Sequence, residues 1–113
     1  MEADDRLLAF SRQLFIHANE HRTVFRAMVG KRSGAVIQQL LHKMLVDLAR
    51  DEVRLMWPSS DKTMPVEATA QFVGGGLFGL LIWWGNGNMR MPVDEVDSTF
   101  RRLAIPAMKA AAR

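Results

Sequence analysis

Two histidines and a glutamate near the N-terminus are the side chains best placed to do chemistry. The segment His17-Ala18-Asn19-Glu20-His21 sets two imidazoles one helical turn apart with a carboxylate beside them. This spacing matches the H-x-x-E-H pattern of one class of zinc peptidase. A catalytic zinc site also needs a third protein ligand and an open coordination position, and no partner motif follows downstream. A zinc hydrolase using these three residues is therefore kept only as an alternative.

A second interpretation explains the same histidines without a metal. His21 lies between Ala18 and Phe25 on an apolar stripe, so a histidine of the core or of a pocket is the simpler explanation. No Gly-x-Ser-x-Gly elbow, P-loop or dinucleotide fingerprint occurs elsewhere in the sequence. We expect no enzyme activity, no catalytic residue, no bound metal and no cofactor.

Composition indicates one soluble globular domain over residues 1–113. The 113 residues are 49% hydrophobic, include no cysteine and carry a net charge of +3. The lack of cysteine excludes a disulfide framework, and the modest charge is weak evidence for direct nucleic-acid binding. The acidic start, MEADDRLLAF, lacks the features of a signal peptide. These features predict a cytoplasmic protein.

Helical periodicity predicts the elements that position the histidines. Apolar residues recur every three, four or seven positions from about Asp4 to residue 29, which indicates one long helix. The glycines of the GKRSG segment, residues 30–34, predict a turn. A second helix is predicted from residue 34 to residue 51 or 56, with its inward residues being Ile37, Leu41, Met44, Leu45 and Leu48.

The central stretch, FVGGGLFGLLIWW at residues 72–84, is the longest apolar run. Thirteen residues are too few to cross a bilayer, which takes about 20, so we expect a helix buried in protein and no membrane. Its helix is predicted to begin at Pro65 and to end in the GNGN segment, where glycine and asparagine tolerate a left-handed cap.

This helix has two apolar sides with different shapes. The bulky side, which should face the domain's own core, holds Val66, Ala70, Val73, Leu77, Leu80, Leu81 and Trp84. The flat side holds Ala68, Phe72, Gly75, Gly79 and Ile82. Each glycine costs roughly 0.8–1 kcal/mol in a helix relative to alanine, so we infer that the flat side receives another helix at close range.

The last helix is predicted to begin at Pro92 and to carry two apolar patches. Its inward arc is predicted to hold Val96, Phe100, Leu103, Ala107 and Ala110. Ile105 and Met108 fall on the opposite side, where they suit a second contact. Pro106 predicts a bend near Arg102. No strand pattern competes, so the fold class is all-α with about four to five helices.

Soft, large side chains dominate the predicted interior. These are Phe10, Phe25, Met28, Met44, Phe72, Trp83 and Trp84, with His17 and His21 as polar groups among them. Such a lining suits an adaptable pocket for an apolar or aromatic ligand, and it equally suits an ordinary core.

The order of these features resembles a known family. The segments HANEHRTVFRAMVG and FVGGGLFGLLIWWGNGNMRMPVDEVDSTFRRLAIPAM, with an amphipathic helix between them, resemble the C-terminal regulatory domain of TetR-type transcriptional regulators of bacteria. The resemblance implies a homodimer in which the last two helices of each chain form a four-helix bundle. It also implies an unidentified apolar or aromatic effector bound by the remaining helices.

The resemblance assigns roles to particular residues. The expected ligand pocket consists of Phe10, Leu14, His17, His21, Phe25 and Met44. The expected dimer interface consists of Ala68, Phe72, Gly75, Gly79, Ile82, Ile105 and Met108. The family's N-terminal helix-turn-helix is not recognisable in residues 1–30. We therefore expect that a repressor of this type contacts operator DNA only through a DNA-binding domain that is missing from this chain. The alternative is a small helical module for protein interaction or dimerisation without a ligand.

Overall fold

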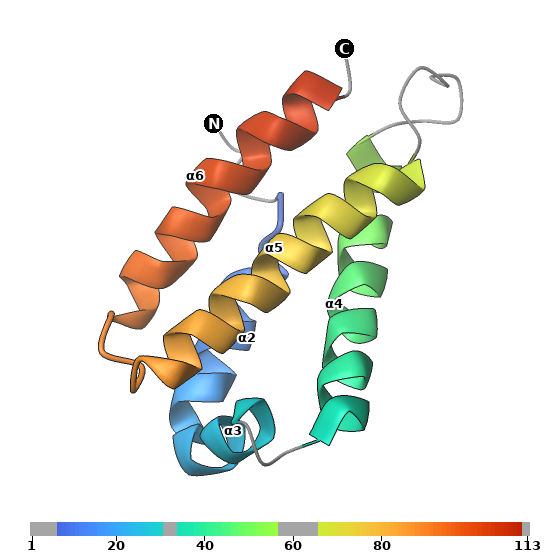
Figure 1. Ribbon diagram of the computed structural model, residues 1–113. Coiled ribbons are helices and arrows are strands. Elements are labelled where there is room, and N and C mark those ends of the chain that lie inside the picture. Colours follow the sequence, from blue (N-terminus) through green and yellow to red (C-terminus); the bar gives the residue numbers. More distant parts are fainter. Residues whose placement is uncertain (1–6, 31–33, 57–65, 112–113) are drawn as a thin grey trace.

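Five helices make up the described part of the chain. The computed structural model describes residues 7–30, 34–56 and 66–111 (Figure 1). Its helices are α2 (Phe10–Glu20), α3 (Arg22–Val29), α4 (Gly34–Met56), α5 (Val66–Asn86) and α6 (Val93–Ala111). Within these ranges every regular element is helical, which confirms the all-α class. The predictions for Asp4 and Pro65 fall outside the described residues.

The first predicted helix is in fact two. The backbone leaves helical geometry at His21, with φ −114° and ψ 42°, and α3 starts at the next residue. Helix α2 buries Ser11, Phe15 and Ala18, and α3 buries Phe25 and Val29. The prediction of one uninterrupted helix was therefore wrong, whereas Ala18 and Phe25 of the predicted stripe are buried.

Helix α4 takes the longer of its two predicted extents, ending at Met56. Its buried residues are Leu45, Val46, Ala49 and Val53. The predicted inward residues Ile37 and Met44 are instead 39% and 44% exposed. The inward face of α4 is thus turned toward Val46 and Val53, because that side meets α5.

Helices α4 and α5 lie side by side and run in opposite directions (Figure 1). The closest point is at Gly74, where an added Cβ atom would lie 2.6 Å from the Cα atom of Val46. The glycine-rich stretch therefore does admit a neighbouring helix at close range, as its composition indicated. That neighbour is α4 of the same chain.

A charged bridge also joins α4 to α5. The Arg50 guanidinium donates two hydrogen bonds to the Glu67 carboxylate, at 2.8 and 2.9 Å, and Gln71 donates a third at 2.8 Å. The Arg50 hydrogen bond, followed by that of Gln71, lowers the pKa of Glu67 to about 2.

The bulky side of α5 forms the centre of the core, as predicted. Ala70, Val73, Leu77, Leu81 and Trp84 are buried. The helix as folded is 21 residues long and contains an 18-residue window with a mean hydropathy of 1.3, so by length and composition it could span a membrane. The thirteen-residue length argument was therefore wrong. Core helices of soluble proteins meet the same criterion, so it is weak evidence for a membrane span.

In the turn after α5 the predicted left-handed backbone is confirmed at an asparagine of the GNGN segment and not at its glycines. The left-handed backbone falls on Asn88 (φ 64°) and Met89 (φ 54°) and on neither glycine of the GNGN segment. Gly85 serves packing instead, since an added Cβ atom would lie 2.7 Å from a methyl group of Val29. Arg22 donates a hydrogen bond to the Asn88 carbonyl and thereby ties the turn to α3.

Helix α6 is rotated from its predicted orientation. Its buried residues are Val96, Asp97, Phe100, Ala104, Ile105 and Met108, whereas Leu103 is 66% exposed. The Ser11 hydroxyl donates a hydrogen bond to the Asp97 carboxylate, and this buried pair fixes the face that α6 turns toward α2. Helix α6 continues through Pro106, and the bend near Arg102 stays a prediction.

Candidate functional site

A small apolar cavity lies between α2, α3, α4 and α5. Its volume is about 180 Å³. Its lining comes from helices that are far apart in the sequence, namely from Leu14, His17, Ala18, His21, Val24, Phe25, Met28, Leu41, Met44 and Leu81. Five of the six residues predicted to form the ligand pocket line this one cavity.

Phe10 is the predicted pocket residue that does not line it. Its side chain is partly buried and packs against the core cluster instead. Phe10 is the first residue of α2, whereas the cavity is lined by Leu14, His17 and Ala18 from the later turns of that helix.

The two histidines lie at the rim of the cavity. Both are exposed and both line the cavity, so His21 is not a core histidine and the pocket alternative fits its position. The His17 and His21 ring centroids are 4.6 Å apart. The cavity is thus apolar in its depth and offers two nitrogen-bearing rings at one edge.

Glu20 joins these histidines in one cluster. A ligating atom from each of His17, Glu20 and His21 lies within 4.8 Å of the other two. In the hydrolase alternative Glu20 would be the general base, which leaves two histidines to hold the ion, one ligand fewer than a catalytic zinc requires. Among the described residues no fourth metal-ligating side chain joins this cluster.

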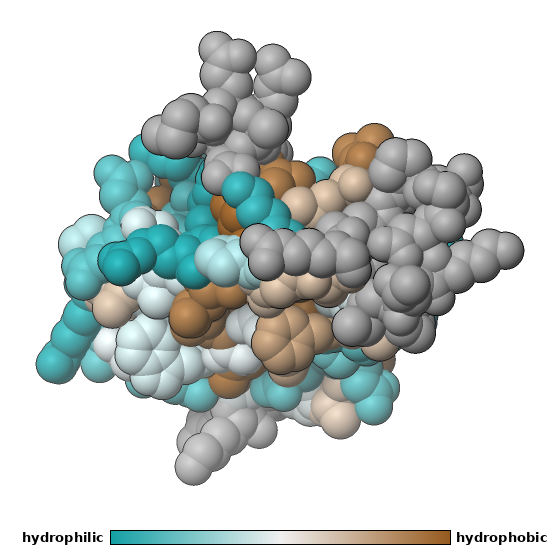
Figure 2. Space-filling model, turned by 90° about the horizontal axis from the view of Figure 1, so that it is seen from above, coloured by the Kyte–Doolittle hydropathy of each residue, from teal (hydrophilic) through white to brown (hydrophobic). Residues whose placement is uncertain are grey.

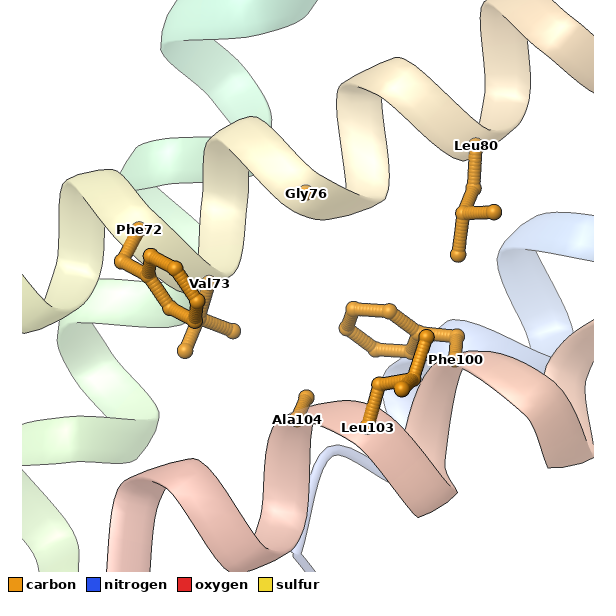
Figure 3. Close-up of a pocket in the computed structure, with 7 residues that line it drawn as sticks. All are labelled: Phe72, Val73, Gly76, Leu80, Phe100, Leu103 and Ala104. Atoms are coloured by element: carbon orange, nitrogen blue, oxygen red, sulfur yellow. The ribbon is translucent and has the colours of Figure 1, made fainter.

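A second hollow lies between α5 and α6. It is a groove of about 460 Å³ lined by Phe72, Val73, Gly76, Leu80, Phe100, Leu103 and Ala104. Figure 3 shows the side chains of both helices pointing into the space between them. A smaller hollow shares Phe72 and continues along Ala68 and Ala107 toward the end of α6. The lining includes no charged residue.

Large apolar side chains stand exposed along this groove and beside it. Phe72 is 69% exposed, Trp83 58% and Leu103 66%. Added Cβ atoms at Gly76 and Gly79 would meet nothing within 4 Å. In the view from above, apolar residues reach the surface just below the centre of the molecule (Figure 2). Phe72 and Trp83 are therefore surface residues and not the interior groups that composition suggested.

The predicted dimer residues divide into two sets. Ala68, Phe72 and Gly79 are exposed. Gly75 instead faces His42 of α4, and Ile82 is partly buried against the core. Ile105 and Met108 are 9% and 0% exposed, so both side chains are packed inside the chain. The reason is the rotation of α6, which buries Ile105 and Met108 and leaves Leu103 exposed in their place.

Of the seven groove residues, only Phe72 was predicted to lie in the dimer interface. The core was the predicted place of Val73, Leu80 and Phe100, and Ala104 was assigned to neither apolar patch of α6. Leu103 was assigned to the inward arc of α6, and Gly76 to neither side of α5. The seven-residue spacing of Phe72, Gly79 and Asn86 with Gly76 and Trp83 between them could have revealed the exposed stripe of α5.

Comparison with known proteins places the chain in a family. The model of a TetR family, described as "Transcriptional regulator C-terminal region", matches residues 5–105. The searches of curated proteins and of solved structures found no significant match. Because the match spans most of the 113 residues, this chain belongs to the family of C-terminal regions of TetR-type transcriptional regulators.

Proposed function

We propose that this chain is the effector-binding and homodimerisation domain of a TetR-type regulator, with the α5–α6 groove as its dimer interface and the cavity beside α2 as its effector site. The observation that carries the proposal is the uncharged groove with three large exposed apolar side chains on or beside it. The family match supports a role in regulation, dimerisation and ligand binding in general terms.

The groove has the properties of a buried contact. Fully burying a large apolar side chain contributes about 1.5–3 kcal/mol, so Phe72, Trp83 and Leu103 together offer a substantial driving force for association. Gly76 and Gly79 leave a flat strip beside them, on which a second helix can lie close to the α5 backbone.

A second copy of the chain is the partner that suits this surface. A two-fold contact requires a self-complementary patch, and this patch combines exposed apolar side chains with a hollow on the same two helices. Pairing α5 and α6 with their copies produces a four-helix bundle. In that arrangement Leu103 replaces Ile105 and Met108 in the predicted interface.

The cavity is suited to a small apolar effector. A cavity of roughly 150 Å³ accommodates benzene, so about 180 Å³ has room for one aromatic ring or a short aliphatic chain. His17 and His21 at the rim can hydrogen-bond a polar substituent of such a ligand. Contact with operator DNA belongs to a separate DNA-binding domain, and the cytoplasm is the proposed location.

Binding of single-ring probes tests the effector site. We expect phenol, benzoate or toluene to raise the melting temperature, because a ligand at a hundred times its dissociation constant adds about 2.7 kcal/mol of stability. Met44→Trp should abolish the rise by filling the cavity. Leu40→Trp is the matched control, since Leu40 is an exposed α4 residue that does not line the cavity.

The outcome separates the proposal from a ligand-free interaction module. If no probe raises the melting temperature, or if Met44→Trp and Leu40→Trp respond alike, the cavity is not an effector site. A helical module that only dimerises would then be the better account.

A further inference from the structure

We propose that His17, Glu20 and His21 form a binding site for a divalent transition-metal ion such as Zn²⁺, placed at the junction of α2 and α3. The site goes beyond effector binding and dimerisation. It shares two residues with the cavity rim, but it does not depend on the cavity holding an effector.

The helix brings the three donors to one side. His17 and His21 are four residues apart and Glu20 is three residues after His17, so the last turn of α2 stacks them on neighbouring positions of one face. The structure confirms this convergence, with the ligating atoms within 4.8 Å of one another and the two rings 4.6 Å apart.

Only a small movement is needed to close the site around an ion. Zinc lies about 2.0–2.2 Å from imidazole nitrogen and carboxylate oxygen, so tetrahedral ligand atoms are roughly 3.4 Å apart. The ligand atoms of the three exposed side chains must therefore approach one another by at most roughly 1.4 Å. Because they lie on the surface, rotation of their terminal bonds accomplishes this without repacking the core.

The donor set selects the class of ion. Two imidazoles and one carboxylate suit zinc, nickel or copper better than magnesium or calcium, which prefer oxygen ligands. Three protein ligands leave at least one coordination position open to water or to another ligand.

The backbone around the site is already fixed. The His21 N–H donates to the His17 carbonyl at 3.1 Å, and the His21 carbonyl accepts a hydrogen bond from the Phe25 N–H at 2.8 Å. The neighbouring Arg22 side chain donates a hydrogen bond to the Asn88 carbonyl, so its positive charge is directed away from the three metal-binding side chains. Binding of an ion would therefore brace the junction at which the long predicted helix breaks in two.

Calorimetric titration of the untagged protein with Zn²⁺ tests the site. We expect one ion per chain and a melting temperature that rises with zinc concentration. His17→Ala and Glu20→Gln should each weaken the affinity at least roughly tenfold, since even outer partners of metal ligands contribute that much. His42→Gln, which changes the chain's third histidine, should bind zinc like the wild type.

Three results would overturn the proposal: no stoichiometric zinc, zinc affinity unchanged in both site variants, or affinity lost in His42→Gln alone. Circular dichroism of each variant excludes unfolding as the cause of a lost signal. Binding of aromatic probes without metal is measured separately, so failure of the metal site and failure of the effector cavity are distinguishable.

Discussion

Gly74 and Gly75 are adjacent on α5, yet their surroundings differ. At Gly74 an added Cβ atom would lie 2.6 Å from the backbone of Val46, whereas at Gly75 the nearest atom would be the His42 Nε2 at 3.7 Å. The first distance is an overlap with backbone that cannot move aside, and the second is an ordinary contact. The glycine at position 74 is therefore required by the α4–α5 packing.

Alanine at the two positions should have opposite effects on stability. We expect Gly74→Ala to lower the free energy of unfolding by about 1–3 kcal/mol, the usual cost of overpacking. Gly75→Ala gains helix propensity and should be neutral or stabilising by up to about 1 kcal/mol. Urea denaturation of both variants checks this, and equal losses would show that Val46 does not limit position 74.

Single residues set the limit of what the sequence could predict about the site. Leu14, His17, His21 and Phe25 line one cavity because helical spacing places them near one another even across the break at His21. Met44 joins them from α4. Phe15 and the Ser11–Asp97 pair were missed, since burial of residues off the main stripe depends on which helix covers them.

At the scale of elements, α4 and α5 are joined by Arg50 and Glu67 as well as by close packing. The bridging hydrogen bonds lower the pKa of Glu67 from 4.5 to about 2. A carboxyl group with a lowered pKa in the folded state binds fewer protons than it does in the unfolded state, so stability rises with pH between these two values.

The bridge should make stability depend on pH in that window. We expect the wild type to be more stable than Glu67→Gln at pH 6, with the difference shrinking as the pH falls from about 4.5 through about 2. Urea midpoints across this range measure it. The control is Glu95→Gln, which removes another exposed carboxyl group in the first turn of a helix. If the stability difference between the wild type and Glu67→Gln were as large at pH 2 as at pH 6, the lowered pKa of Glu67 would be contradicted.

Ser11 and Asp97 join α2 to α6 in a similar way but within the core. Ser11→Ala removes the hydrogen-bond donor and leaves a buried carboxylate without it, which should cost about 1–3 kcal/mol of unfolding free energy. Chemical denaturation checks this against Ser98→Ala, which changes an exposed serine next to Asp97 on α6 and should be nearly neutral. Equal effects of the two variants would mean that the pair does not stabilise the α2–α6 contact.

Helix existence and approximate length were predictable for α4, α5 and α6, since their apolar periods are long and are bounded by glycine and proline. The rotation of α6 was not, because Leu103 on one side and Ile105 and Met108 on the other are equally apolar. The choice between them depends on Asp97, which must meet Ser11, and periodicity does not encode that contact.

For the whole molecule, the central question is what covers the α5–α6 groove. Isolated exposed apolar residues are common on proteins, but Phe72, Trp83 and Leu103 lie along one pair of helices with an uncharged hollow beside them. A second exposed apolar set, Val36 and Leu40 on α4, provides an internal comparison, since it lies outside the groove.

Sedimentation equilibrium of matched lysine variants tests the dimer most directly. Leu103 and Leu40 are 66% and 63% exposed, so lysine at either position should leave the folded chain intact. At Leu103, lysine would bring a charge into the proposed interface, which is costly without a partner. We predict about twice 12.8 kDa for the wild type and for Leu40→Lys, and about 12.8 kDa for Leu103→Lys. A monomeric wild type, or dissociation by Leu40→Lys but not by Leu103→Lys, would contradict the account.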